Sequence, residues 1–179
     1  MNDPKAAAAQ GPQTLEEFMA QALLMEREAV ERYTEFADSL EAHNNNEVAA
    51  LFRTMAGYES KHAEQIMAQM GWSKDPTPPT QLMHWPGLDA GPETVDIDQV
   101  HYLMQPWHAL QLALAAEKRA EAFFAVIAKM AVSEPIRKAA LQLQAEEAEH
   151  VALVQGWIAK TPPPDQDWAV DPDPTRFTD

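Results

Sequence analysis

The chain has 179 residues and a formal net charge of −15, from 28 acidic and 13 basic side chains. This length predicts one domain with a substantial hydrophobic core, and the negative charge argues against nucleic acid and anionic membranes as partners. No cysteine is present, which excludes disulfides, thiolate catalysis, iron–sulfur clusters and a rubredoxin-type iron site. No apolar run is long enough for a membrane span or a secretory leader, so we expect a cytoplasmic protein.

The first part of the chain predicts two helices joined by a short turn. Residues 1–13 are rich in Ala, with Gly and Pro, and are expected to be disordered. The capping-box pattern Thr14-Leu15-Glu16-Glu17 begins a helix that runs to about residue 41. Asn44, with Glu47 three residues later, is expected to cap a second helix that ends near residue 70, before Gly71.

A long connection follows over residues 71–105, where five prolines rule out a long helix across most of the segment. A four-helix bundle whose second and third helices are parallel needs one such crossover. Residues 96–104 are expected to form a short helix before Pro106, which fits the first position of a third helix over residues 106–131. A fourth helix is predicted over residues 134–159, and the Pro-rich tail 161–179 is expected to be extended or disordered. The sequence thus predicts an all-α four-helix bundle over residues 14–160.

Two Glu-x-x-His sequences, Glu59–His62 and Glu147–His150, carry the chemistry. A Glu and a His three residues apart lie on one face of a helix and can bind one metal ion. Such a spacing alone usually marks a solvated helix face. Here both pairs lie on the apolar stripe of their helix, as do Glu26 in the first helix and Glu117 in the third. A buried glutamate must be paired, protonated or bound to a metal ion.

The order Glu, then Glu-x-x-His, occurs twice and indicates a repeat of two helical hairpins. Residues on antiparallel helices lie at one height when the turn falls midway between them. The midpoint of Glu26 and Glu59 falls beside the turn at residues 44–46, and the midpoint of Glu117 and Glu147 lies next to residues 133–135. The carboxylates of each hairpin are therefore predicted to meet at one level.

Four glutamates and two histidines that converge in a bundle core predict a site for two metal ions. Two divalent cations carry four positive charges, which balance four carboxylates and remove most of the objection to burying them. Carboxylate and imidazole ligands suit iron or manganese, with zinc as the competitor.

These motifs resemble those of the ferritin-like di-iron carboxylate proteins, and within them the rubrerythrin group. The resemblance covers about residues 14–160. It implies a di-iron centre and a homodimer, with six ligands by motif match: Glu26, Glu59, His62, Glu117, Glu147 and His150.

Two departures from the rubrerythrin pattern stand out. The chain has no C-terminal rubredoxin domain, so electrons must come from a separate donor protein. Rubrerythrins also carry an extra glutamate one turn beyond the third-helix ligand, where this chain has Ala120, with Glu121 as the next residue. Glu121 is either that seventh carboxylate or an exposed residue. Tyr33, seven residues after Glu26, is a candidate hydrogen-bond donor beside the metals, although such an aromatic is more often a plain core residue.

Three functions are compatible with this pattern. The leading interpretation is a di-iron oxidoreductase that reduces hydrogen peroxide. The second is a ferroxidase or iron-handling protein that uses dioxygen and takes iron as its substrate. The third is a non-catalytic helical interaction module with a vestigial site, against which the intact ligands in both halves argue.

Overall fold

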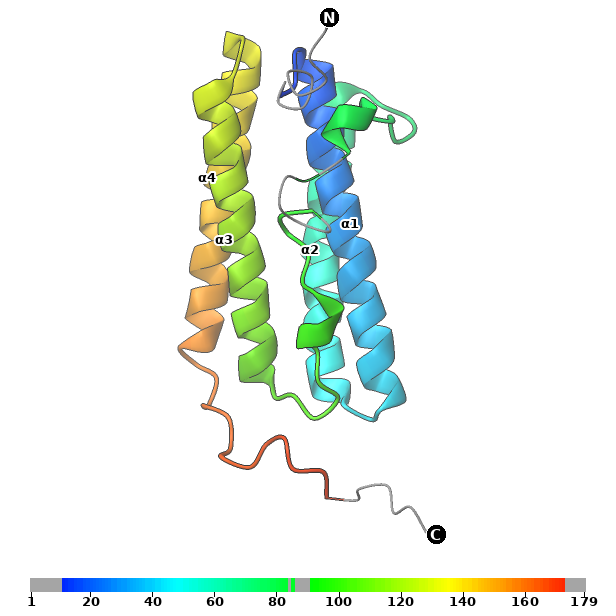
Figure 1. Ribbon diagram of the computed structural model, residues 1–179, viewed down its shortest axis with the longest axis vertical. Helices are drawn as coiled ribbons and strands as arrows, with labels where there is room; N and C mark the ends of the chain where they lie inside the picture. The colour runs from blue at the N-terminus through cyan, green and yellow to red at the C-terminus, as the bar shows by residue number, and fades with distance from the viewer. Residues whose placement is uncertain (1–10, 84, 86–90, 173–179) are drawn as a thin grey trace, which may run out of the picture.

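Four long helices make up the fold of the computed structural model, which describes residues 11–83, 85 and 91–172. They are α1 (Leu15–Ala42), α2 (Asn46–Met70), α3 (Pro106–Met130) and α4 (Glu134–Ile158). Figure 1 shows two antiparallel hairpins, α1–α2 and α3–α4, standing side by side with α2 and α3 parallel. The predicted all-α four-helix bundle with a long α2–α3 connection is confirmed. Among the described residues, no helix is both long and apolar enough to cross a membrane.

The helix ends follow the local signals of the sequence with one exception. Thr14 caps α1 by accepting a hydrogen bond from the backbone N–H of Glu17 at 3.1 Å. Gly71 ends α2 in the left-handed conformation, with φ of 67°. The prediction that Asn44 caps α2 was wrong, because Asn44 itself takes a positive φ of 60° in the turn. The following residue, Asn45, is the cap and accepts from the N–H of Val48.

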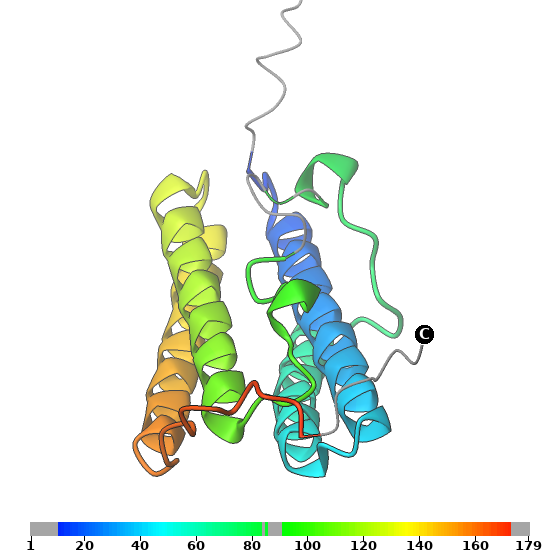
Figure 2. The same ribbon diagram turned by 60° about the horizontal axis from the view of Figure 1, so that its bottom comes forward.

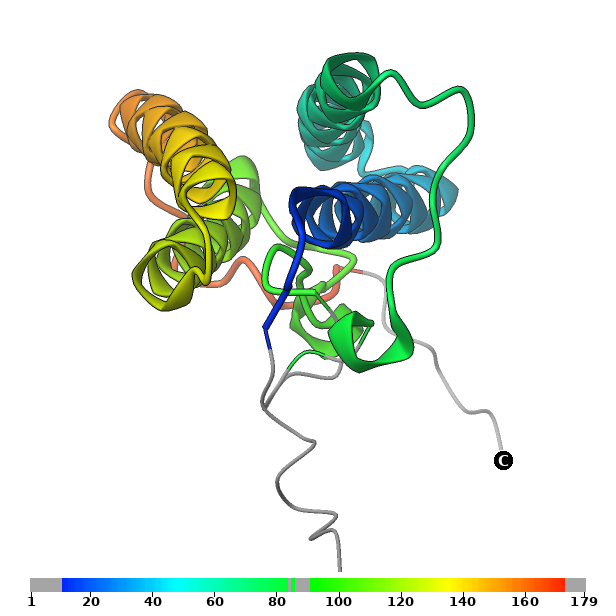
Figure 3. The same ribbon diagram turned by 90° about the horizontal axis from the view of Figure 1, so that it is seen from above.

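In the described residues of the crossover between α2 and α3, the helical elements are two single-turn 3-10 helices, η1 (Thr80–Leu82) and η2 (Ile97–Gln99). The short helix expected over residues 96–104 is therefore reduced to one turn, because a separate turn closed by a hydrogen bond from the Met104 N–H to the His101 carbonyl follows it. Viewed from above, the second half of the crossover lies along the side of the bundle formed by α1 and α3 (Figure 3). The crossover is thus part of the bundle wall.

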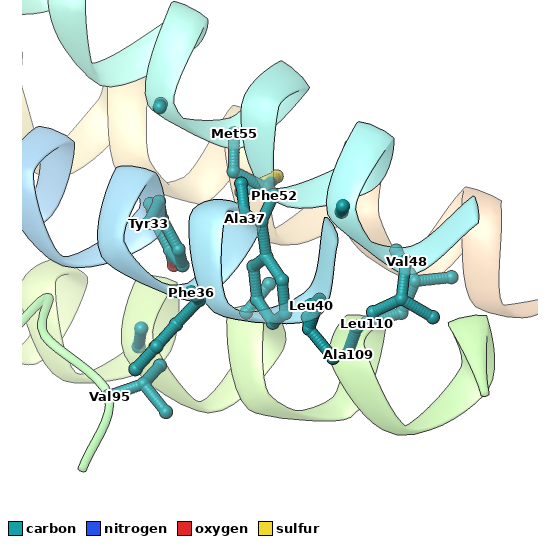
Figure 4. Packing of buried hydrophobic residues seen from close by; sticks show 14 of the residues in the cluster. Tyr33, Phe36, Ala37, Leu40, Val48, Phe52, Met55, Val95, Ala109 and Leu110 are labelled. Carbon is teal, nitrogen blue, oxygen red and sulfur yellow. The ribbon is translucent and has the colours of Figure 1, made fainter. Parts of the chain in front are cut away.

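The bundle core consists of two apolar clusters, one toward each end of the helices. One cluster is built around Phe36, Leu40 and Phe52, and Figure 4 shows its side chains interleaved between α1, α2 and α3. The other is built around Phe18 and Phe124, whose rings meet edge to face at 6.1 Å between centroids. Along each helix the residues of one cluster give way to those of the other at the same height. The site described below lies at this boundary.

The C-terminal segment turns back beneath the ends of the helices (Figure 2). Trp168 packs against the ring of His108 in α3, with 4.1 Å between centroids. The side chain of Gln105 donates to Asp165 at 2.8 Å, and the hydroxyl of Tyr102 donates to Asp171 at 2.7 Å. The disorder predicted for residues 1–13 falls almost wholly outside the described residues, and the tail after residue 172 is also outside them.

Candidate metal centre

Each of the four helices contributes one completely buried glutamate at the boundary between the two apolar clusters. These residues are Glu26, Glu59, Glu117 and Glu147, and all four are 0% exposed. Small residues make room for them, because buried alanines lie about one turn before and one turn after three of the four: Ala22 and Ala29, Ala56 and Ala63, Ala113 and Ala120. The helical period that places these glutamates on the apolar face therefore also supplies the space that their carboxylates occupy.

The two histidines of the Glu-x-x-His pairs meet across the bundle. The rings of His62 and His150 are stacked, with 4.4 Å between centroids and 15° between planes. His62 Nδ1 lies 3.8 Å from Glu26 Oε2, and His150 Nδ1 lies 3.4 Å from Glu117 Oε2. Their side chains are 12% and 14% exposed, so the centre reaches the surface on the histidine side.

The six residues singled out from the sequence fall into overlapping groups that offer ligand atoms within 4.8 Å of one another. Glu59 groups with both histidines, Glu26 groups with His62 and Glu147, and Glu117 groups with Glu147 and His150. The overlap through Glu147 and the histidines joins the groups into a single cluster. Both hairpins thus contribute to one centre, which suits two adjacent ions better than two separate ones.

A fifth carboxylate, which the sequence reasoning missed, belongs to the same cluster. Glu93 comes from the crossover, is 0% exposed, and groups with Glu26 and Glu59 within the same 4.8 Å. It lies outside the long helices, so no periodic pattern could assign it to an inward face. The prolines around it indicated only that the segment is not helical.

Burial and mutual repulsion keep these carboxyl groups from ionising freely in the metal-free protein. Burial first, and then the neighbouring carboxylates, raise the pKa of Glu26, Glu59 and Glu93 well above the usual range and that of Glu147 to about 12. Burial, followed by the charge of His150, lowers the pKa of His62 to about 4. The neutral imidazole that a metal ion requires is thus the favoured form.

The cluster fits a pair of cations because nothing else in the described part of the chain satisfies it. Apart from one another's carboxyl groups, the oxygens of the five buried glutamates have no hydrogen-bond partner there, and no Arg or Lys side chain forms an ion pair with them: Glu26, Glu59, Glu93, Glu117 and Glu147. Unsatisfied buried carboxylates are costly. Two divalent ions would supply the missing positive charge and the missing bonds together.

Two further residues were candidates for roles beside the metals. Tyr33 is 1% exposed, its hydroxyl has no hydrogen-bond partner among the described residues, and its ring stacks on Phe52. Burial, and then the charges of Glu117 and Glu59, raise its pKa well above the usual value. Glu121 is half-buried and belongs to none of the groups of ligand atoms found among the described residues. The structure thus brings Tyr33, but not Glu121, close to the carboxylates.

Comparison with known proteins gives the family. The rubrerythrin family model matches residues 17–156. A structure described as COG1633, an uncharacterized conserved protein from Magnetospirillum magnetotacticum MS-1, is 35% identical, with a TM-score of 0.63, over 85% of this chain and 98% of that one. Rhodobacter capsulatus bacterioferritin is 20% identical, with a TM-score of 0.54, over 85% of this chain and 88% of that one, which shows the shared ferritin-like fold alone. No curated protein sequence matches the chain. The match over most of the chain, together with the buried Glu and His cluster, shows that the protein belongs to the rubrerythrin family.

Proposed function

We propose that this protein is a di-iron oxidoreductase that reduces hydrogen peroxide to water. The observation that supports the proposal most is the cluster itself, in which two Glu-x-x-His pairs and two further glutamates meet from both hairpins in a buried centre. Rubrerythrins are a family of di-iron oxidoreductases, and the resemblance to that group suggests peroxide as the oxidant. Six side chains would hold the two ions: Glu26, Glu59, His62, Glu117, Glu147 and His150.

The chain's own groups suit this reaction in three respects. Reduction of one peroxide to two water molecules consumes two electrons and two protons, and iron, when bound, supplies the electrons. A carboxylate that changes the way in which it binds the ions could accept or deliver a proton at a free Oε atom. The complete burial of the carboxylates excludes bulk water and large molecules, and the partly exposed edges of His62 and His150 leave an approach for a small oxidant.

The Tyr33 hydroxyl is a further donor within this proposal, because it is buried beside the carboxylates without a hydrogen-bond partner of its own. The 179 residues contain no cysteine for a rubredoxin-type site, and within this proposal a separate protein delivers the electrons. We expect this donor to act on a homodimer.

Anaerobic stopped-flow spectroscopy of the protein loaded with two ferrous ions per chain tests the proposal. Peroxide is expected to oxidise the loaded protein much faster than dioxygen does, and an added donor protein is expected to sustain turnover. Faster oxidation by dioxygen, with uptake of iron beyond two ions per chain, would instead identify a ferroxidase. Failure to bind two metal ions would refute both functions.

A further inference from the structure

Glu93 is an unusual residue for a crossover loop. Loops normally run over the surface, where their polar groups meet water, yet Glu93 is 0% exposed and its carboxylate lies among those of Glu26 and Glu59. Among the residues that the structure describes, no group other than a neighbouring carboxyl forms a hydrogen bond with its oxygens. A buried, unpaired carboxylate at this position needs either a cation or a strong structural reason.

The backbone around Glu93 forms a tight turn, from which the side chain of Glu93 reaches the carboxylates of Glu26 and Glu59. The N–H of Thr94 donates to the carbonyl of Gly91 at 2.9 Å, and the Thr94 hydroxyl donates to the same oxygen at 2.6 Å. Pro92 and Glu93 are the two central residues of this turn, and proline is favoured at the first of these positions because its φ is preset. The Gly91–Thr94 turn is therefore stabilised locally before any contact with the helices.

Helix α3 holds the Gly91–Thr94 turn from one side through Arg119. The guanidinium of Arg119 donates from Nε to the Pro92 carbonyl at 2.9 Å and from a terminal nitrogen to the Thr94 carbonyl at 2.7 Å. These two carbonyls lie immediately before and after Glu93 in the chain. Because the fork of the guanidinium is planar and rigid, the two bonds set the direction of the turn as well as its distance from α3. Arg119 follows the predicted ligand Glu117 by two residues.

Helix α1 holds the same turn from the other side through Glu28. One carboxylate oxygen of Glu28 accepts hydrogen bonds from the Gly91 N–H at 2.9 Å and from the indole N–H of Trp85 at 3.1 Å. The approach is so close that a Cβ atom on Gly91 would lie 2.7 Å from this oxygen. Glu28 follows the predicted ligand Glu26 by two residues, so the two helices that carry these ligands also carry the residues that hold the turn.

We propose that Glu93 is a metal ligand of the centre, delivered by the crossover, and that Arg119 and Glu28 are the positioning residues that hold it there. This inference rests on the two-metal site of the proposed function. It accounts for the length of the crossover, which must run back along the bundle and pass the centre on the α1–α3 side. It also accounts for the contacts of the turn, because Arg119 and Glu28 hold the backbone of the residues on either side of Glu93.

Cobalt(II) tests the inference because its visible absorption reports the number of ligands and needs no catalytic activity. Wild-type protein is expected to bind two Co²⁺ ions per chain. Glu93→Ala is expected to weaken binding of one of them by about 10-fold or more. The visible absorption per ion should increase, since an ion with fewer ligands absorbs more strongly. Glu93→Gln preserves the size of the side chain and removes its charge, so it serves as the second test should the alanine variant fold poorly. This variant is also expected to weaken metal binding.

The positioning residues are tested by the same spectrum. Arg119→Gln leaves Glu93 itself unchanged but removes both hydrogen bonds from Arg119 to the turn. The cobalt spectrum of this variant is therefore expected to show part of the change seen in Glu93→Ala. Lys118→Gln, an exposed neighbour on α3, and Asp96→Asn, an exposed crossover carboxylate, are matched controls expected to leave spectrum and affinity unchanged.

Three results are distinguishable. If wild-type protein binds two cobalt ions and the Glu93 variants bind both with unchanged affinity and spectrum, Glu93 is not a ligand, while the two-metal function stands. If wild-type protein does not bind two ions, the proposed function fails and this inference fails with it. An unchanged spectrum in Arg119→Gln alone would remove the positioning role and leave Glu93 as a ligand.

Discussion

Metal removal should make the stability of this protein fall as the pH rises. In the metal-free protein, burial and mutual repulsion raise the pKa of Glu26, Glu59, Glu93 and Glu147, so some of these groups remain protonated at neutral pH. In the unfolded chain the same groups are ionised above about pH 4.5. The native state then binds more protons than the unfolded state, and its free energy of unfolding falls as the pH rises.

The size of the effect follows from the number of protons retained. Each proton that the native protein keeps and the unfolded chain releases lowers the free energy of unfolding by about 1.4 kcal/mol per pH unit. His62 acts in a different window, because its pKa is lowered to about 4 in the folded protein. The unfolded histidine, with a pKa of about 6.5, still binds some protons up to about pH 7.5, and this contribution to the slope has the opposite sign. Between about pH 7.5 and 8.5 the slope therefore reports the carboxyl groups.

Urea unfolding followed by circular dichroism measures this slope. In the presence of a chelator, we expect the free energy of unfolding to fall by at least about 1.4 kcal/mol per pH unit over this range. With two divalent ions bound, the carboxylates are ionised in the native state as well, so the fall should vanish. Glu147→Gln removes one titrating group, and its metal-free slope should be shallower than that of wild type. A metal-free protein whose stability is constant or rises from pH 7.5 to 8.5 would refute the reasoning.

Four other predictions concern single residues. Glu59→Ala and Glu147→Ala should each abolish binding of two metal ions, as measured by metal analysis, and full loading would contradict the ligand assignment. Glu121→Gln should still bind two ions, because Glu121 lies outside the ligand groups; loss of an ion would make it a ligand after all. Tyr33→Phe should keep both ions but slow oxidation by peroxide about 10-fold, and an unchanged rate would leave Tyr33 a plain core residue. Phe52→Ala should cost about 3–5 kcal/mol in urea unfolding, because the ring is fully buried between two aromatic neighbours.

Most of the bundle could be predicted from the sequence because apolar residues recur along it with the period of a helix. The apolar stripes around Glu26 and Glu117 and the two Glu-x-x-His pairs each obey a local rule, in which residues three and four apart share a helix face. The turn midpoints then placed the carboxylates of each hairpin at one level. Helices α3 and α4 begin at the predicted residues, Pro106 and Glu134, because each has a proline in its first turn, where proline favours the start of a helix.

Glu93 could not be found in this way because its position depends on contacts between distant segments. It is 26 residues before Arg119 in the chain, and no pattern in the sequence marks those two residues as neighbours. The same limit explains why the sequence offered Glu121, on the helix that carries Glu117, as the additional carboxylate. At the helical position one turn beyond Glu117 the structure has a completely buried alanine, Ala120, and the additional carboxylate comes from the crossover instead.

The crossover makes the two halves of the centre unequal. The two hairpins are near copies in sequence, so by themselves they would present two nearly equivalent metal positions. Glu93 breaks this equivalence, because it groups with Glu26 and Glu59 of the first hairpin. Tyr33 and Phe124 occupy corresponding places in the two hairpins, and they also make the halves unequal, since Tyr33 carries a hydroxyl and Phe124 does not. With Glu93 as a ligand, the centre would hold five carboxylates and bear one negative charge more than two divalent ions neutralise. Because the charge of Glu93 also acts on Glu117 and Glu147 of the second hairpin, this excess would be shared by both metal positions.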